Sequence, residues 1–314
     1  MRRSLTAICA GVLLAAGFST IAGRHAAASD NVLRVCLDED LPPASVHRRG
    51  KDGSGFDVLL AQALAKELQR PLAIQWFESK LDEDSSPELE ANALLSDGRC
   101  ALLGGYPLTQ DSLVVPGAKT AKLPDFDGAT RDDHRRRVTL GVLAPSRPYV
   151  YSALTVVLGS KARDRHIKDL GDLAGLKIGI ESGTFADAIL MNFGKGRLID
   201  QITHLVPGRD DLFGALERGE LDATLVDMRR LDAWRARHPD SQLGASGYYY
   251  PIGANRAYVA LAGDSELIGA VNKALSALEA NGTIEQLART AGLTYLKPRE
   301  PIVLGDVLQQ ILQK

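Results

Sequence analysis

The sequence predicts an α/β protein of two lobes, each a mainly parallel β-sheet flanked by helices. Short apolar runs suited to buried strands alternate with segments of helical periodicity along most of the chain. The chain has 314 residues, which favours two domains and is ample for a sizeable core. No internal repeat or low-complexity segment interrupts this alternation.

The first 28 residues predict a secretory signal peptide. Arg2 and Arg3 form a basic start, residues 5–22 are apolar, and residues 26–28 are an Ala-Ala-Ala cleavage site. A retained membrane anchor is the alternative, but the apolar stretch is short for a membrane span. The sequence therefore predicts a protein exported to the periplasm.

The charge of the remaining chain gives no sign of nucleic-acid binding. The signal segment carries three arginines and no acidic residue, so its removal shifts the net charge from −2 to about −5. We therefore expect no nucleic-acid partner.

Two cysteines remain after that cleavage, Cys36 and Cys100. In an oxidising compartment an even pair predicts a disulfide, which would stabilise the fold by about 4 kcal/mol in the chain-entropy model. Two buried free thiols are the alternative.

The first part of the chain predicts three strands and two helices in the order β-α-β-α-β. The predicted strands are 33–37, 72–77 and 101–103, and the predicted helices are 56–68 and 89–95. This order implies a parallel sheet with right-handed crossovers.

Residues 105–148 are long, polar and proline-bearing, and include the run Arg135-Arg136-Arg137. Loops of this length in compact domains are functional or mobile. We expect the arginine run to be a solvated loop, with a partner-docking patch as the alternative.

The rest of the chain predicts a second lobe between two hinge crossings, and then a return to the first lobe. Residues 155–158 are the predicted first crossing and 248–253 the second. The predicted second-lobe strands are 177–181, 202–206 and 223–226, with helices 185–193, 210–217 and 231–238. After the second crossing we expect a strand at 258–261 and helices at 266–279 and 284–291. The chain then ends in a tail at 297–314, whose second half is predicted to be helical. The predicted domains are 29–152 with 253–296 for lobe 1, 153–252 for lobe 2, and 297–314 for the tail.

Ordered landmarks then connect the chain to a family. They are Leu33 to Pro43, Gly53 to Leu68, Leu173 to Thr184, Gly214 to Ala223, and the closing pattern of 264–267, 271–275 and 281–283. In this order they resemble the extracytoplasmic solute-binding proteins of family 3, the amino-acid-type periplasmic binding proteins of type II. The resemblance implies two lobes joined by two hinge crossings, and no enzymatic activity. It implies a small polar solute in the cleft between the lobes: an amino acid, an amine or a small organic acid. It implies a monomeric receptor that serves an ABC permease in the inner membrane.

The resemblance also implies ligand-binding positions. Ser182, Gly183 and Thr184 match the helix opening that offers N–H donors, and an ordinary N-cap turn is the alternative. Asp227 matches the aspartate that binds a ligand ammonium, and a strand-end carboxylate facing water is the alternative. The position of the family's carboxylate-binding arginine falls on Ser112, whose hydroxyl cannot replace a charged guanidinium fork.

Further candidates lie on the rim of the first lobe. Asp38, Glu39 and Asp40 could, with Asp227, present carboxylates to an amine or a metal ion, and a solvated acidic loop is the alternative. Two more predicted cleft-lining residues are Tyr106 and Thr109. The histidines are scattered without metal-ligand spacing, so the sequence predicts no metal site, no cofactor and no catalytic residue.

A narrower resemblance gives a second function. Arg34-Val35-Cys36 followed by Gly98-Arg99-Cys100 is similar to the subgroup associated with periplasmic quinoprotein alcohol dehydrogenases. That resemblance implies an accessory protein whose partner is the dehydrogenase, and the 107–147 insertion is the candidate docking segment. A periplasmic dehydratase built on the same scaffold is a third, weaker alternative, because the cationic clamp for a carboxylated substrate is missing.

Overall fold

The computed structural model describes residues 31–48, 50–79, 86–113 and 120–305. The predicted signal peptide and the predicted helix in the second half of the tail lie outside these residues. No helix within the described ranges is both long and apolar enough to cross a bilayer.

Most strands belong to one ten-stranded mixed sheet, ordered β12-β11-β13-β10-β14-β5-β1-β4-β7, with β9 paired to β14. Its first part contains β1 (Leu33–Asp38), β4 (Leu72–Glu78) and β5 (Leu102–Pro107). β1 lies between the other two and runs parallel to both, with Leu33 opposite Leu72 and Val35 opposite Leu102. The connecting helices are α1 (Phe56–Glu67) and α2 (Pro87–Ser96). The predicted β-α-β-α-β order of a parallel sheet is confirmed.

The second part of the sheet is also parallel. β11 (Ile178–Glu181) pairs in parallel with both β12 (Ile202–Leu205) and β13 (Ala223–Asp227). Its helices are α4 (Phe185–Asn192), α5 (Leu212–Glu217) and α6 (Met228–Arg237), all within a few residues of the predicted bounds. Short 3₁₀ turns lie at Leu170–Leu173 and Ile199–Gln201.

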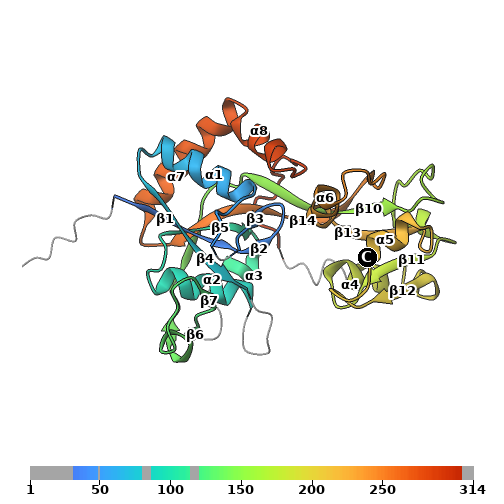
Figure 1. Cartoon of the computed structure of the whole chain (residues 1–314), viewed down its shortest axis with the longest axis horizontal. Helices are drawn as coiled ribbons and strands as arrows, with labels where there is room; N and C mark the ends of the chain where they lie inside the picture. The colour runs from blue at the N-terminus through green and yellow to red at the C-terminus, as the bar shows by residue number, and fades with distance from the viewer. Residues whose placement is uncertain (1–30, 49, 80–85, 114–119, 306–314) are drawn as a thin grey trace, which may run out of the picture. The chain divides into compact units, whose positions relative to one another are not determined.

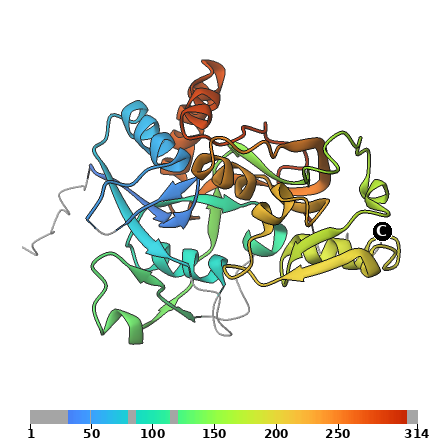
Figure 2. The same cartoon turned by 45° about the vertical axis from the view of Figure 1, so that its right-hand side comes forward.

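Two long strands connect the parts, as Figures 1 and 2 show. β10 (Val150–Leu158) pairs antiparallel with β13 and with β14 (Ala245–Leu261). β14 pairs in turn with β5 and with β9 (Leu143–Pro145). The separate return crossing and strand predicted at 248–253 and 258–261 are thus one strand of 17 residues.

The buried apolar residues form four clusters. Two draw on residues 33–150 and 258–293, and the other two on residues 154–252. This grouping accords with two lobes, although the predicted domain boundaries themselves stay a prediction. Helices α7 (Ser265–Ala280) and α8 (Thr283–Thr290) pack with α1 on the first core.

The insertion after β5 is more ordered than predicted. It contains α3 (Gln110–Leu113), β6 (Thr120–Lys122), β7 (Asp125–Phe126), a 3₁₀ turn at Asp133–Arg135 and β8 (Arg137–Thr139). Arg135, Arg136 and Arg137 are exposed, as predicted for the arginine run, but apolar side chains on either side of that run are buried in the cluster that includes α2. The buried residues are Ala121, Leu123, Phe126, Val138 and Leu140.

Cys36 and Cys100 form the predicted disulfide. Cys36 lies on β1 and Cys100 lies two residues before β5, so the bond joins neighbouring strands. Both cysteines are buried in the cluster that also receives the insertion.

Candidate functional site

A cavity of about 350 Å³ lies beside β10 and β14, where residues from both parts of the sheet meet. It is lined by Thr109, Ser152, Ala153, Leu154, Ile180, Glu181, Thr184, Phe185, Ala186, Leu212, Leu225, Val226, Asp227, Arg230, Ile252, Gly253, Ala254, Arg256 and Leu304. A cavity of this size holds a small organic molecule.

Most of the lining is apolar. Ile180 on β11 and Leu225 on β13 are buried strand residues, because both strands are covered on two faces. Phe185 opens α4 and keeps 37% of its surface exposed at the cavity. Such a lining favours a ligand with a substantial apolar body.

Two charged groups of the cavity are paired with each other. Arg230 Nη2 donates to Glu181 Oε1 at 2.6 Å, and the Glu181 side chain is only 7% exposed whereas that of Arg230 is 52% exposed. Arg230 therefore has guanidinium surface left for a ligand, while Glu181 is covered.

The predicted helix opening is used mainly within the chain. Thr184 is the N-cap of α4 and its Oγ1 accepts from Asp187 N at 3.2 Å. Gly183 takes a positive φ of 75° and donates its N–H to Asp187 Oδ2, and Ser182 N donates to Leu205 O. Only Thr184 of these three lines the cavity. The capping alternative is thus seen directly, and the donor role of this opening stays a prediction.

Asp227 lines the cavity but already holds a cation. Arg229 donates to its carboxylate from the backbone N–H, from Nε and from Nη2, at 2.9, 3.2 and 3.1 Å. Ser152 Oγ donates to Oδ2 at 3.2 Å. Burial raises the pKa of Asp227, but the charges of Arg229 and Arg256 and the bonds from Arg229 outweigh burial and lower it. Asp227 therefore stays ionised at neutral pH and is satisfied without a ligand.

Ser112 is not in the cavity. Its hydroxyl donates to Pro107 O at 2.7 Å and accepts from Thr109 N at 3.2 Å, and the residue is 5% exposed. Tyr106 is 2% exposed and its hydroxyl donates to Ser112 O. Both residues hold the turn after β5 in shape, and of this group only Thr109 reaches the cavity.

The acidic rim residues lie elsewhere. Asp38 ends β1, and Asp40 begins β2 (Asp40–Leu41), which pairs with β3 (Ser45–Val46). Asp38 Oδ1 accepts from Asp40 N at 2.9 Å. Burial raises the pKa of Asp38, although the backbone bond from Asp40 opposes that shift. Neither residue lines the cavity, so the structure does not bring them together with Asp227.

The C-terminal tail contributes a lining residue that the sequence did not predict. Leu304 N donates to Leu108 O at 2.9 Å and Gln110 N donates to Leu304 O at 2.8 Å, so the tail pairs with the turn after β5. Asn255 fixes the preceding residues, because its Nδ2 donates to Arg299 O and Ile302 O and its Oδ1 accepts from Arg299 N. Leu304 thereby lines the cavity, and its backbone pairs with the turn that leads to Ser112, the position expected for a carboxylate clamp.

The sequence also missed Arg230, Glu181 and Arg256. Arg256 is on β14 and donates Nη1 to Gly105 O at 3.2 Å; burial and the neighbouring Arg229 lower its pKa to about 10. Arg230 follows Asp227 closely in sequence, so an arginine at the start of α6 was the available signal. Its pairing with Glu181 joins residues 49 positions apart, and no local pattern indicates that.

Comparison with known proteins gives one relative in sequence and several solved structures with the same fold. No family model matches the chain. A curated protein of Paracoccus denitrificans, described as an uncharacterized protein in the cycB 3′ region, is 36% identical over 78 residues, which are 24% of this chain and 86% of that protein.

Solved structures of amino-acid receptors share the fold. An ancestral cationic amino acid solute-binding protein has a TM-score of 0.57 at 20% identity, over 83% of this chain and 95% of its own. The L-cystine solute receptor of Neisseria gonorrhoeae, unliganded and open, has a TM-score of 0.56 at 18% identity, over 83% and 93%. Substrate-binding domain 2 of GlnP from Lactococcus lactis, also open, has a TM-score of 0.58 at 20% identity, over 84% and 96%. The predicted fold class, a two-lobed periplasmic binding protein of type II, is confirmed.

Proposed function

We propose that this chain, which belongs to the same family as the Paracoccus denitrificans protein and has the fold of the amino-acid solute-binding proteins, is the periplasmic receptor of an ABC-type importer. It binds a small solute in the cleft cavity without altering it chemically. The cavity beside β10 and β14 is the observation that supports this proposal.

The lining narrows the class of solute. A free amino acid needs a cation for its carboxylate and an anion for its ammonium, and here Asp227 and Glu181 are each already paired with an arginine. Arg230 keeps half of its side-chain surface exposed at the cavity. A small organic acid with an apolar body fits these groups best, with its carboxylate at Arg230 and its body against Ile180, Phe185 and Leu225.

Ligand-dependent thermal shifts test this proposal. Purified protein is screened against aliphatic and aromatic carboxylic acids, the matching amines, and free amino acids, and each hit is measured by titration calorimetry. We expect the acids to give the largest shift, and Arg230→Gln to weaken their binding at least tenfold.

A matched pair of variants locates the binding. Ala254→Phe places a large ring in the cavity, whereas Ala236→Phe places the same ring on the exposed surface of α6. Binding should be lost in the first variant and kept in the second. A flat response of the unaltered protein to the whole panel, or binding that survives Ala254→Phe, contradicts the proposal.

The second candidate function is that of a partner protein of a periplasmic quinoprotein alcohol dehydrogenase. One observation favours it: Ser112 and Asp227, which stand at the family's two charged positions, are both satisfied inside the chain, and Leu304 lines the cavity beside the turn that holds Ser112. A mostly apolar cleft with no free charge at these two positions would suit a segment of another protein. Titration of the purified dehydrogenase into this protein tests that function, and a complex that Ala254→Phe abolishes would support it.

A further inference from the structure

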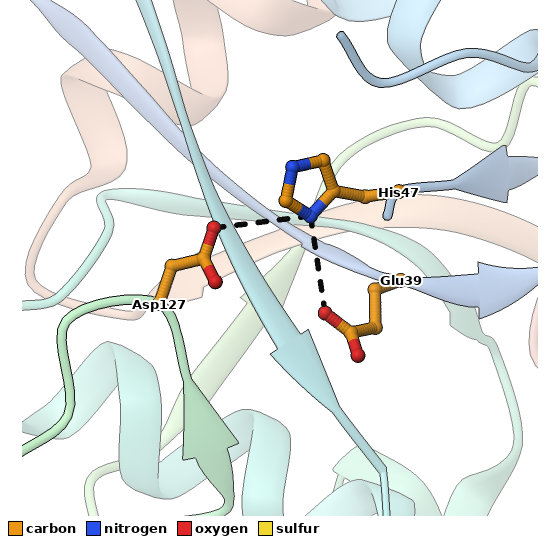
Figure 3. Close-up of side chains that lie close together, drawn as sticks. All are labelled: Glu39, His47 and Asp127. Atoms are coloured by element: carbon orange, nitrogen blue, oxygen red, sulfur yellow. Dashed lines mark ion pairs between the residues drawn. The ribbon is translucent and has the colours of Figure 1, made fainter. Parts of the chain in front are cut away.

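Three potential metal ligands gather at one edge of the first part of the sheet, apart from the cleft cavity (Figure 3). Glu39 follows β1, His47 follows β3, and Asp127 follows β7. One ligand atom from each lies within 4.8 Å of the other two. The residues are up to 88 positions apart in sequence, so only the fold brings them together.

Backbone hydrogen bonds hold the three positions. His47 N donates to Glu39 O at 2.9 Å, and Glu39 N donates to Phe77 O at 2.9 Å. Asp127 N donates to Trp76 O at 3.0 Å. The strand β4, which carries Trp76 and Phe77, is thus the common support of the two carboxylates, and the site rests on regular structure.

The His47 ring is fixed by Trp76. The two rings stack with centroids 4.7 Å apart and planes within 4° of each other, which leaves the histidine side chain only 10% exposed. The backbone of Gly53 packs directly against the Trp76 indole. A Cβ at this position would lie only 2.0 Å from Trp76 Cζ2, so a larger residue would displace the ring. The imidazole is therefore held in one orientation before any ligand arrives.

The Nδ1 atom of His47 is the decisive observation. It is buried and makes no hydrogen bond to any residue that the structure describes, and it faces Glu39 Oε2 at 3.9 Å and Asp127 Oδ2 at 3.8 Å (Figure 3). A buried polar atom without a partner costs about 1–3 kcal/mol, and most such atoms in native proteins have an explanation, among them an absent ion. The space between Nδ1 and the two oxygens is where that ion would be.

We propose that Glu39, His47 and Asp127 bind a divalent transition-metal ion, with zinc as the preferred ion. One imidazole nitrogen and two carboxylate oxygens are a ligand set that zinc commonly has, with water in the fourth position. Ligand atoms around tetrahedral zinc are about 3.4 Å apart, from bond lengths of about 2.0–2.1 Å. The observed distances need only a small inward movement, and Glu39 and Asp127 can make it because their side chains are 34% and 44% exposed.

The electrostatics favour a cation at this point. The pKa of Glu39 is raised, by burial first and then by the negative charges of Glu78 and Asp127. The carboxylates therefore repel one another, and a bound cation would relieve that repulsion. An imidazole ligand selects zinc over calcium or magnesium, which prefer sets made of oxygen alone.

Protonation of His47 is the competing account. An imidazolium between two carboxylates would also relieve the repulsion, and it would need no metal. The two accounts differ in pH dependence, because a metal ion requires a deprotonated Nδ1 and is lost as the pH falls, whereas the imidazolium forms as the pH falls.

The test uses untagged protein freed of metal with a chelator and titrated with ZnCl₂ at pH 7.5 and pH 5.5 by calorimetry. We expect one zinc ion per chain at pH 7.5 and at least tenfold weaker binding at pH 5.5. Glu39→Gln, Asp127→Asn and His47→Gln should each weaken binding at least tenfold. The two carboxamide variants keep the shape of the original side chains, so they test the ligands even where His47→Gln disturbs the stacking on Trp76.

His134→Gln is the matched control. His134 Nδ1 lies 3.0 Å from Asp125 Oδ1, in the same insertion as Asp127, and no third ligand of the described part of the chain comes near enough to complete a set. Zinc binding should be unchanged in this variant. Absence of zinc binding in the unaltered protein, or binding that survives all three cluster variants, would overturn the proposal, and so would Mn²⁺ or Ca²⁺ binding in preference to Zn²⁺.

Discussion

At the scale of single residues, Asp227, which the sequence predicted to bind a ligand ammonium, is already paired within the chain. Asp227 caps α6 and accepts from Arg229 N, while the Arg229 guanidinium covers the same carboxylate. An ammonium ligand would have to displace that guanidinium. The aspartate thus stabilises the start of α6 whether or not it also contacts a solute.

Asp227→Asn tests this structural role. An asparagine still caps the helix but loses the ion pair, so we expect the free energy of unfolding to fall by about 1–3 kcal/mol in urea titrations at pH 7. Asp211→Asn is the control: Asp211 also caps a helix, α5, and pairs with Arg218, but both side chains are more than half exposed. A loss below about 1 kcal/mol is expected there. Equal effects would show that the pair at Asp227 contributes no more than a surface pair.

Asp57 predicts an unusual pH dependence. It is 3% exposed in the first turn of α1, and burial raises its pKa to about 6 although Tyr149, Arg229 and Arg256 oppose the shift. Tyr149 Oη donates to its Oδ1 at 3.0 Å. Since the pKa in the folded state exceeds the unfolded value of 3.8, the folded protein binds the proton more tightly. The contribution of this group to stability is therefore full below pH 4 and lost as the pH rises through about 6.

Urea titrations from pH 4 to pH 7 on the unaltered protein and Asp57→Asn measure that contribution. The stability of the unaltered protein relative to the variant should fall by up to about 3 kcal/mol over this range, because two pKa units correspond to about 2.7 kcal/mol. A difference between the two proteins that does not change with pH would show that Asp57 is ionised throughout.

At the scale of elements, the tail is a structural part of the cleft. Asn255, 2% exposed on β14, makes short hydrogen bonds to Arg299 and Ile302, and the tail then places Leu304 against the turn after β5. Leu304 packs on the core that contains the second-lobe strands. One asparagine on β14 thus fixes the part of the tail that precedes Leu304.

Asn255→Ala should release the tail. It removes three hydrogen bonds shorter than 3.0 Å, each worth about 1 kcal/mol, so we expect the Leu304 amide to exchange with deuterium at least tenfold faster. Asn281→Ala is the control, because Asn281 accepts only from Thr283 N at the start of α8. Unchanged protection of Leu304 would show that its pairing with Leu108 is sufficient to hold the tail.

The same elements show how far the sequence alone could lead. Strands such as Leu33–Asp38 and Ala223–Asp227 were predicted closely, since buried parallel strands are short apolar runs. β14 was divided in the prediction because Pro251 and Gly253 interrupt its apolar pattern, whereas pairing with strands on both sides keeps it continuous. The pairing of Glu181 with Arg230 and the cluster at His47 depend on long-range contacts, which carry no periodic signal.

At the scale of the whole molecule, β10 and β14 lie in the middle of the strand order of the large sheet. They connect the two core clusters of the first part of the sheet with the two of the second part. The disulfide starts from β1 and is buried in the cluster that also contains residues of α2 and of the insertion. Cys36 and Cys100 are separated by 64 positions, a segment that contains α1, β4 and α2. The bond therefore closes a loop in the unfolded chain that spans most of the segment from β1 to β5.

Removing the bond should destabilise the protein by about 2–4 kcal/mol, because a closed loop of this length lowers the entropy of the unfolded state by an amount worth about 4 kcal/mol. Two measurements separate the cross-link from packing. Reduction of the unaltered protein breaks the bond and keeps both sulfur atoms, whereas Cys36→Ala with Cys100→Ala also removes buried side-chain volume beside Phe77 and Leu94. If loop entropy dominates, urea titrations of the two forms should give nearly the same loss. A much larger loss in the double variant would instead show that the sulfur atoms act mainly by filling the core, in which case the insertion packed on that core would be the first part of the chain to lose protection in deuterium exchange.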